Sequence, residues 1–437
     1  MAQPSIAERI SYGFGNFGAN LAFGMAGAYL LYFYTDVYRV SAGIVATLFL
    51  VARCLDAVFD PLFGLLIDRT QTRFGKHRPY LIGLCVPYAL CGVALFSTPH
   101  VSALFKIAFL YGTYTLFGML YSGLSLPLNS MLPTLTRDGK TRTSINALRE
   151  FLGSSATVGA TFITLPLVHW FGGSLAGGFA ATAALFGIVS IIALTTAFFK
   201  TRERVGPERS PQVLTTRQSL RAARGNWPWV ATMLVNFFFW VGFIGHIQSV
   251  IYYADDVLHR ADLVPEIMLT NVVLLIGTAL SAFVANRIGK RTTGMIGAAI
   301  AAACTAAIPM SNLRFWVLSM NGACNFGLGL IGGLLFAFMA DSVDYGEWRS
   351  GFRAQGFLFA AASFGVKLGM SIGGAAGAWL LSRAHYVAGV PVTPPIAVSI
   401  VWGHIWIPTA SYFLMGLSLS LFRFPGRYGT SGAGATG

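Results

Sequence analysis

The chain has 437 residues, of which 55% are hydrophobic and 11% are charged. Soluble proteins carry about 25% charged residues, so this composition excludes an ordinary soluble domain and indicates a membrane protein. Lys and Arg outnumber Asp and Glu by 30 to 16. Because these charges separate apolar runs of ~20 residues and form no basic stripe, they argue against nucleic-acid binding.

Twelve apolar segments follow one another along the chain, and each is long enough to cross a ~30 Å hydrocarbon core as a helix. They lie at about 11–36, 42–67, 79–98, 103–130, 143–170, 175–199, 227–251, 263–286, 292–309, 314–340, 354–382 and 395–422. We therefore expect an all-α membrane protein with twelve transmembrane helices. Most Lys and Arg residues fall at the termini and in the even-numbered loops, which predicts that both termini are cytoplasmic.

The longest hydrophilic stretch, 200–226, divides the segments into six plus six. It predicts an N-terminal six-helix bundle at 1–199, a cytoplasmic linker at 200–226 and a C-terminal six-helix bundle at 227–437. A weak repeat agrees with this division, because DRTQTRFGKHRPYLIG follows the second segment and NRIGKRTTGMIG follows the eighth. Two such repeats of six helices are typical of major facilitator transporters.

The second segment carries three charges, Arg53, Asp56 and Asp60, spaced so that they share one helix face. A charge at mid-membrane costs about 2.5–3.5 kcal/mol, so this face must look inward. Two carboxylates one turn apart with oxygen ligands suit Na⁺ or H⁺. The alternative is structural, with Arg53 and Asp56 paired and Asp60 capping a neighbouring helix.

Two further basic residues lie within apolar segments. Lys367 is central in the eleventh segment, about 14 residues from each end, so it should form a salt bridge or line a cavity. Arg149 lies near the cytoplasmic end of the fifth segment, where it can either act in a site or extend to the interface.

The tenth loop is unusually acidic for the cytoplasmic side, with the sequence DSVDYGEWRSGFR. Two interpretations stay open, a solvated loop or charge pairs that form and break as the bundles rock. The gating candidates are Asp341, Asp344, Glu347 and Arg353.

Enzymatic chemistry has no support in the motifs. The five cysteines lie inside apolar runs, the seven histidines lack ligand spacing, and no nucleophile, zinc or phosphate-loop motif is present. We expect no enzyme, no cofactor and no metal beyond Na⁺ at Asp56 and Asp60.

The stretches SYGFGNFGANLAFG, YLLYFYTDVY, ATLFLVARCLDAVFDPLFGLLIDRTQTRFGKHRPY and DSVDYGEWRSGFR resemble the glycoside-pentoside-hexuronide:cation symporters, the melibiose permease-like family. The resemblance spans the chain. It implies a major facilitator fold and cation-coupled sugar uptake by alternating access in a bacterial inner membrane.

The resemblance also implies site residues. Those for cation coupling are Asp56, Asp60, Tyr121, Ser122 and Lys367. Those for substrate binding are Asn20, Ser125, Asn129, Arg149 and Lys367. Where melibiose carriers have acidic residues or tryptophan, this chain has Asn20, Ser125 and Asn129, which puts a galactoside substrate in doubt.

The leading hypothesis is a secondary transporter that imports a glycoside, pentoside or hexuronide with Na⁺ or H⁺, as a monomer in the bilayer. The alternative is a lipid or lysolipid transporter of the same fold. Because Arg149 is a bidentate donor and the acidic positions are neutral here, we lean towards an anionic sugar, with a neutral one as the other option.

Overall fold

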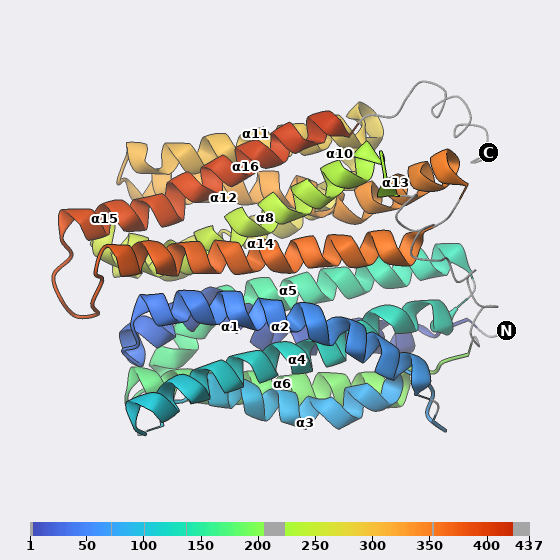
Figure 1. The fold of residues 1–437 in the computed structure, drawn as a ribbon, viewed down its shortest axis with the longest axis horizontal. Coiled ribbons are helices and arrows are strands. Elements are labelled where there is room, and N and C mark those ends of the chain that lie inside the picture. The colour runs from blue at the N-terminus through green and yellow to red at the C-terminus, as the bar shows by residue number, and fades with distance from the viewer. Residues whose placement is uncertain are drawn as a thin grey trace. The chain divides into compact units, whose positions relative to one another are not determined.

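The computed structural model describes residues 3–204 except 71, 100 and 137, and residues 223–422 except 352 and 353. Within these ranges the chain is helical, and the one pairing of β type is an isolated bridge between Thr72 and Gly75. Contacts divide the chain into two compact units (Figure 1). Unit 1 comprises Met1–Ser210 and Leu381–Ile396, and unit 2 comprises Pro211–Leu380 and Ala397–Gly437.

Unit 1 is a bundle of long helices, drawn in blue to green in Figure 1. They are α1 (Ile6–Tyr32, continued by the π-helical turn η1, Phe33–Val37), α2 (Ala42–Arg69), α3 (Arg78–Leu95), α4 (Ala103–Leu135), α5 (Gly139–Phe171) and α6 (Leu175–Lys200). Side-chain caps set several starts: Ser5 accepts from the amide of Glu8 at 3.3 Å, and Asp138 from that of Thr141 at 2.9 Å.

Helix α1 is central to the packing of unit 1, since it lies against both α5 and α6. Small residues permit this close approach. A Cβ on Gly18 would lie 2.7 Å from the Cβ of Ala193, and one on Gly24 would lie 2.8 Å from the Cα of Thr157. The remaining helices pack as α3 against α4 and α6, and α2 against α4.

Unit 2 is built from shorter and more interrupted helices, two of which extend into Leu381–Ile396 of unit 1. They are α8 (Trp227–Tyr252), η2 (Tyr253–Val257), η3 (Ala261–Leu263), α9 (Val264–Leu269), α10 (Val272–Ile288), α11 (Lys290–Ala307), η4 (Ile308–Met310), α12 (Arg314–Gly332), α13 (Leu335–Ser350), α14 (Gln355–Arg383), α15 (Pro394–Val401), η5 (Trp402–Trp406), α16 (Ile407–Ser418) and η6 (Leu419–Leu421). Its core is apolar, with Phe239, Phe338 and Tyr412 at most 5% exposed.

Each predicted segment coincides with one helix or with a run of consecutive helices, although some details differ. The segment predicted at 314–340 divides at Gly333 and Leu334 and then continues to Ser350. The acidic run from Asp341 to Arg349 is therefore the end of helix α13, and the prediction of a loop there is wrong. Once a helix has formed, each further residue adds one backbone hydrogen bond at little cost, so α13 continues past the apolar part of the sequence.

Ten helices of the described residues are long and apolar enough to span a membrane. Helices α1 and α2 are not among them. Polar residues such as Asn16 and Asn20, together with several glycines, lower the hydropathy of α1. Side chains of α2 are described only in part, and its described apolar stretch, Ala42–Ala52, is shorter than a membrane span. An all-α membrane fold is thus confirmed, whereas the count of twelve crossings stays a prediction.

The predicted domain boundaries also stay a prediction. The contacts place Leu381–Ile396 with unit 1, where the Tyr386 hydroxyl donates to Asp36 Oδ1 at 2.7 Å. Residues 205–222 of the predicted linker lie outside the described residues.

Candidate functional site

A chain of hydrogen bonds joins α1, α4 and α5 inside unit 1. The Tyr121 hydroxyl donates to Asn20 Oδ1 at 3.1 Å, and Asn20 Nδ2 donates to the carbonyl of Asn16 at 2.8 Å and to its Oδ1 at 3.1 Å. Asn16 Nδ2 in turn donates to the backbone carbonyl of Arg149 at 3.0 Å. Two side chains from the predicted site, Asn20 and Tyr121, are therefore in direct contact.

Arg149 is 4% exposed on α5, so it does not extend to the interface. Its terminal nitrogens donate to Asn129 Oδ1 on α4 and to Glu150 Oε1. Its Nε is buried and has no hydrogen-bond partner among the described residues. The guanidinium is thus held by groups of unit 1 and keeps one buried donor.

Asp56 lies on α2 and is 2% exposed. It packs against α4 at Gly118, where an added Cβ would lie 2.9 Å from Asp56 Oδ1. Ser122, one turn further along α4, is buried. Since residues four apart share a helix face, Asp56, Gly118 and Ser122 occupy the same face of the α2–α4 contact.

The other predicted positions are less completely described. Asp60 and Ser125 are half-buried, and Asn129 is exposed apart from its contact with Arg149. The side chain of Arg53 lies outside the described part of the chain. Lys367 is half-buried on α14 of unit 2, so its predicted closeness to Asp56 stays a prediction.

Among the gating candidates, Asp341 forms an ion pair with Lys290 at 2.8 Å. Asp344 and Glu347 follow on the same helix, α13, and Arg353 lies outside the described residues. Lys290 belongs to the second copy of the Gly-Lys repeat.

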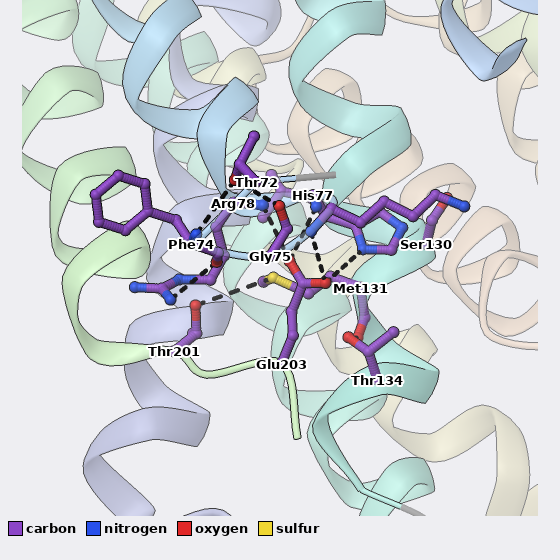
Figure 2. Close-up of polar contacts among 12 residues, drawn as sticks. Thr72, Phe74, Gly75, His77, Arg78, Ser130, Met131, Thr134, Thr201 and Glu203 are labelled. Carbon is purple, nitrogen blue, oxygen red and sulfur yellow. Dashed lines mark hydrogen bonds and ion pairs between the residues drawn. The ribbon is translucent and has the colours of Figure 1, made fainter. Parts of the chain in front are cut away.

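The first copy of that repeat also meets a carboxylate, which Figure 2 shows. Glu203 follows α6 and accepts from the amides of Lys76, His77 and Arg78 at 2.9–3.2 Å, and His77 Nδ1 lies 3.2 Å from it. The carboxylate thus occupies the N-terminus of α3, where unpaired amides and the helix dipole favour an anion. Gly75, at φ 108°, leaves room for the carboxylate, because a Cβ added at this position would lie 2.5 Å from Glu203 Oε1.

The electrostatics of Glu203 follow from these donors. Burial opposes the charged form, but hydrogen bonds from the side chain and amide of His77 and from the amide of Lys76 outweigh it and lower the pKa of Glu203 to about 2. Its neighbour Arg204 forms a bidentate pair with Glu8 at 2.6 and 2.7 Å. The segment Thr201–Arg204 is therefore fastened across the ends of α1 and α3.

Sequence reasoning missed Asn16, Glu8 and Glu203. Asn16 is an amide one turn before Asn20 on the same helix face, which was a usable signal. Glu203 lies in a hydrophilic stretch interpreted as a linker, and only the absence of an acidic residue in the first turn of α3 pointed to an outside anion.

An apolar bundle that buries Asp56, Arg149 and a set of amides is the architecture of a membrane transporter. The family model described as MFS/sugar transport protein matches residues 11–425. The chain belongs to this family, whose members are transporters and not enzymes, and the resemblance to the melibiose permease-like symporters is confirmed.

Individual relatives cover nearly the whole chain. The isoprimeverose transporter of Lactiplantibacillus pentosus is 35% identical over 433 residues, which are 95% of this chain and 88% of that protein. The inner membrane symporter YicJ of Escherichia coli strain K12 is 32% identical over 94% of this chain and 90% of that protein. The crystal structure of the nucleoside transporter NupG matches with a TM-score of 0.65 at 12% identity, over 96% of this chain and all of that chain.

Proposed function

We propose that this protein imports a glycoside, pentoside or hexuronide together with Na⁺ or H⁺, by alternating access across a bacterial inner membrane, with twelve crossings and cytoplasmic termini. The observation that carries the proposal is Asp56, a carboxylate 2% exposed within an apolar helical unit. Keeping such a charge at membrane depth is costly, and a bound cation offsets the cost. Relatives named as a sugar transporter and a symporter support this function.

In this proposal the cation lies on the face shared by α2 and α4. Asp56 and Asp60 supply carboxylate oxygens, and Tyr121 and Ser122 stand beside them on α4. Hard monovalent cations prefer such oxygen ligands. If the ammonium of Lys367, half-buried on α14 of unit 2, is counted with the two carboxylates, the group has a net charge of about −1, which suits one monovalent cation.

In this proposal the sugar contacts a set of polar side chains, namely Asn20, Ser125, Asn129, Arg149 and Lys367. Amide and hydroxyl side chains donate and accept, so they suit the hydroxyl groups of a sugar. Arg149 already donates to Asn129 and to Glu150, and a neighbouring carboxylate offsets its charge. These contacts favour a neutral sugar over the anionic one to which the sequence leaned.

Uptake into membrane vesicles tests the coupling. A membrane potential of ~100 mV supplies ~2.3 kcal/mol for one cation, which supports accumulation of roughly 50-fold. Asp56→Asn and Asp60→Asn should reduce the accumulation ratio of a labelled glycoside to about one, while the variants still insert. The matched control is Asp262→Asn, which changes an exposed carboxylate in unit 2.

Concentrative uptake unchanged in both variants would show that the carboxylates are structural. Repeating the assay with and without Na⁺ and with an uncoupler distinguishes the two ions. A panel of matched glucosides, glucuronides and lysolipids distinguishes a neutral sugar, an anionic sugar and the lipid alternative.

A further inference from the structure

Two buried histidines stack on each other inside unit 2. His246 on α8 is 8% exposed and His404 on η5 is fully buried. Their ring centroids are 4.2 Å apart with an interplanar angle of 16°. Each ring lies beside the other's backbone, with His246 Nδ1 3.0 Å from the carbonyl oxygen of His404 and His404 Nδ1 3.1 Å from that of His246. A carbonyl only accepts, so both Nδ1 atoms carry hydrogen.

The second nitrogen of His246 faces another acceptor. Its Nε2 lies 2.9 Å from Asn321 Oδ1 on α12. The orientation of that amide is set on its other side, because Asn321 Nδ2 donates to the carbonyl of Val317 at 2.8 Å. Turning the amide over would place two oxygens against each other at Val317.

Counting donors therefore gives an unusual result for His246. A neutral imidazole donates from one nitrogen and accepts at the other, whereas the imidazolium donates from both. His246 has acceptors at both nitrogens, so the observed contacts match the imidazolium. Without the second proton, either Nε2 meets Asn321 Oδ1 lone pair to lone pair, or the amide turns and its contact with Val317 is lost.

His404 differs from His246 although the rings are stacked. Its Nε2 is buried and has no hydrogen-bond partner among the described residues. Tyr253 covers its other face, with ring centroids 4.5 Å apart. A proton on His404 Nε2 would have no acceptor and would lie close to any charge on His246, so one proton on the pair excludes a second.

The backbone around the pair is also unusual. His404 lies in the π-helical turn Trp402–Trp406, and Tyr253 begins another, Tyr253–Val257. Such turns are frequent at functional sites, and they change the normal helical pairing of carbonyl groups. Here the turn presents the His404 carbonyl to a side chain of α8.

Titratable groups near the rings are few. Apart from the two rings themselves, Tyr253 from η2 contacts His404, and Asn321 from α12, which does not titrate, contacts His246. Helix α14 packs beside Gly245 through the backbone of Gly373. Of the described residues, no carboxylate or basic side chain contacts either ring. Burial opposes a charge here, and the two acceptors favour it.

We propose that His246, His404 and Asn321 form a proton-binding site in unit 2, which holds one proton as the imidazolium of His246. Proton release turns or displaces Asn321, so the site couples protonation to the packing of α8, η5 and α12. Gly373 lies six residues after Lys367 on α14, about 9 Å along the helix, so the site adjoins the element that carries that lysine. The proposal does not depend on which sugar or cation is transported.

Nitrogen NMR of the full chain in lipid nanodiscs tests the site directly. With ¹⁵N-labelled histidine, the two ring nitrogens of an imidazolium give signals unlike those of neutral tautomers, and His246→Gln and His404→Gln assign them. We expect His246 to show the imidazolium pattern in a titration from pH 10 to pH 5, while His404 stays a neutral Nδ1–H tautomer. A neutral His246 at every pH would overturn the proposal.

Asn321→Asp sharpens the test, because it replaces the acceptor with a carboxylate of the same size. An anion at this distance should move the His246 midpoint to higher pH by ~1 unit or more. The matched control is Asn325→Asp, one turn further on α12, where the amide contacts Thr270 instead. Equal shifts in both variants, or none in either, would contradict the assigned contact. If Asn321→Asp does not fold, the titration of the unmodified chain decides.

Discussion

At the scale of single residues, Gly118 shows how the α2–α4 contact depends on the absence of a side chain. A Cβ added at residue 118 would lie 2.9 Å from Asp56 Oδ1, which is too close for an ordinary contact. Gly112 lies on the same helix with no atom within 4 Å of its would-be Cβ. The two glycines therefore form a natural pair for experiment.

Gly118→Ala should displace the Asp56 carboxylate and weaken cation coupling. Overpacking costs about 1–3 kcal/mol, and 1.4 kcal/mol is tenfold, so the cation concentration for half-maximal uptake should rise about tenfold. Gly112→Ala should leave it unchanged. The measurement is sugar uptake against cation concentration at equal amounts of inserted protein, and identical curves for the two variants would refute this role for Gly118.

At the scale of elements, the segment after α6 fastens helix ends that are far apart in sequence. Glu203 closes the N-terminus of α3, and Arg204 pairs with Glu8 of α1. Arg204 N also donates to the carbonyl of Thr134 at 2.9 Å, which ties the segment to the end of α4. We expect this segment to stabilise unit 1.

Glu203→Gln should lower the Tm of the purified protein by several degrees at pH 7, because three amides of the α3 N-terminus lose their anion. The pKa of Glu203 falls from 4.5 to about 2 on folding, so its contribution is complete above about pH 4.5 and is lost as the pH falls towards 2. The difference in Tm between parent and variant should therefore shrink over that range. A pH-independent difference would indicate lost packing instead of lost charge.

At the scale of the whole molecule, the two copies of the Gly-Lys repeat both lead to carboxylates. Gly75 and Lys76 contact Glu203 in unit 1, and Lys290 pairs with Asp341 in unit 2. Both repeats follow even-numbered segments, and the distribution of Lys and Arg predicts that the loops after these segments are cytoplasmic.

Cysteine labelling checks this topology. In a chain whose five cysteines are replaced, Arg73→Cys should react with an impermeant maleimide only in inside-out vesicles, since it lies in the second loop. Asn312→Cys, in the ninth loop, should react only in right-side-out vesicles. Both positions are exposed. Labelling of both from one side would contradict the twelve-helix topology.

Helices and family were accessible from the sequence because they depend on local patterns. Runs of ~20 apolar residues predict spanning helices whatever their partners are, and the motifs around Asp56 carried the family resemblance. The inward direction of Asp56 was also predictable, since a carboxylate facing lipid is costly.

Tertiary structure decided which polar groups meet. Asn16 joins Asn20 to Arg149. Glu203 accepts hydrogen bonds from the N-terminus of a helix that begins 125 residues earlier, and the rings of His246 and His404 meet although 158 residues separate them. Hydropathy cannot reveal such pairs, because each contact depends on the packing of two helices and on small residues that let them approach. The sequence by itself determined where the helices are and that charges are buried among them, and only the fold determined the partners that each charge and amide has.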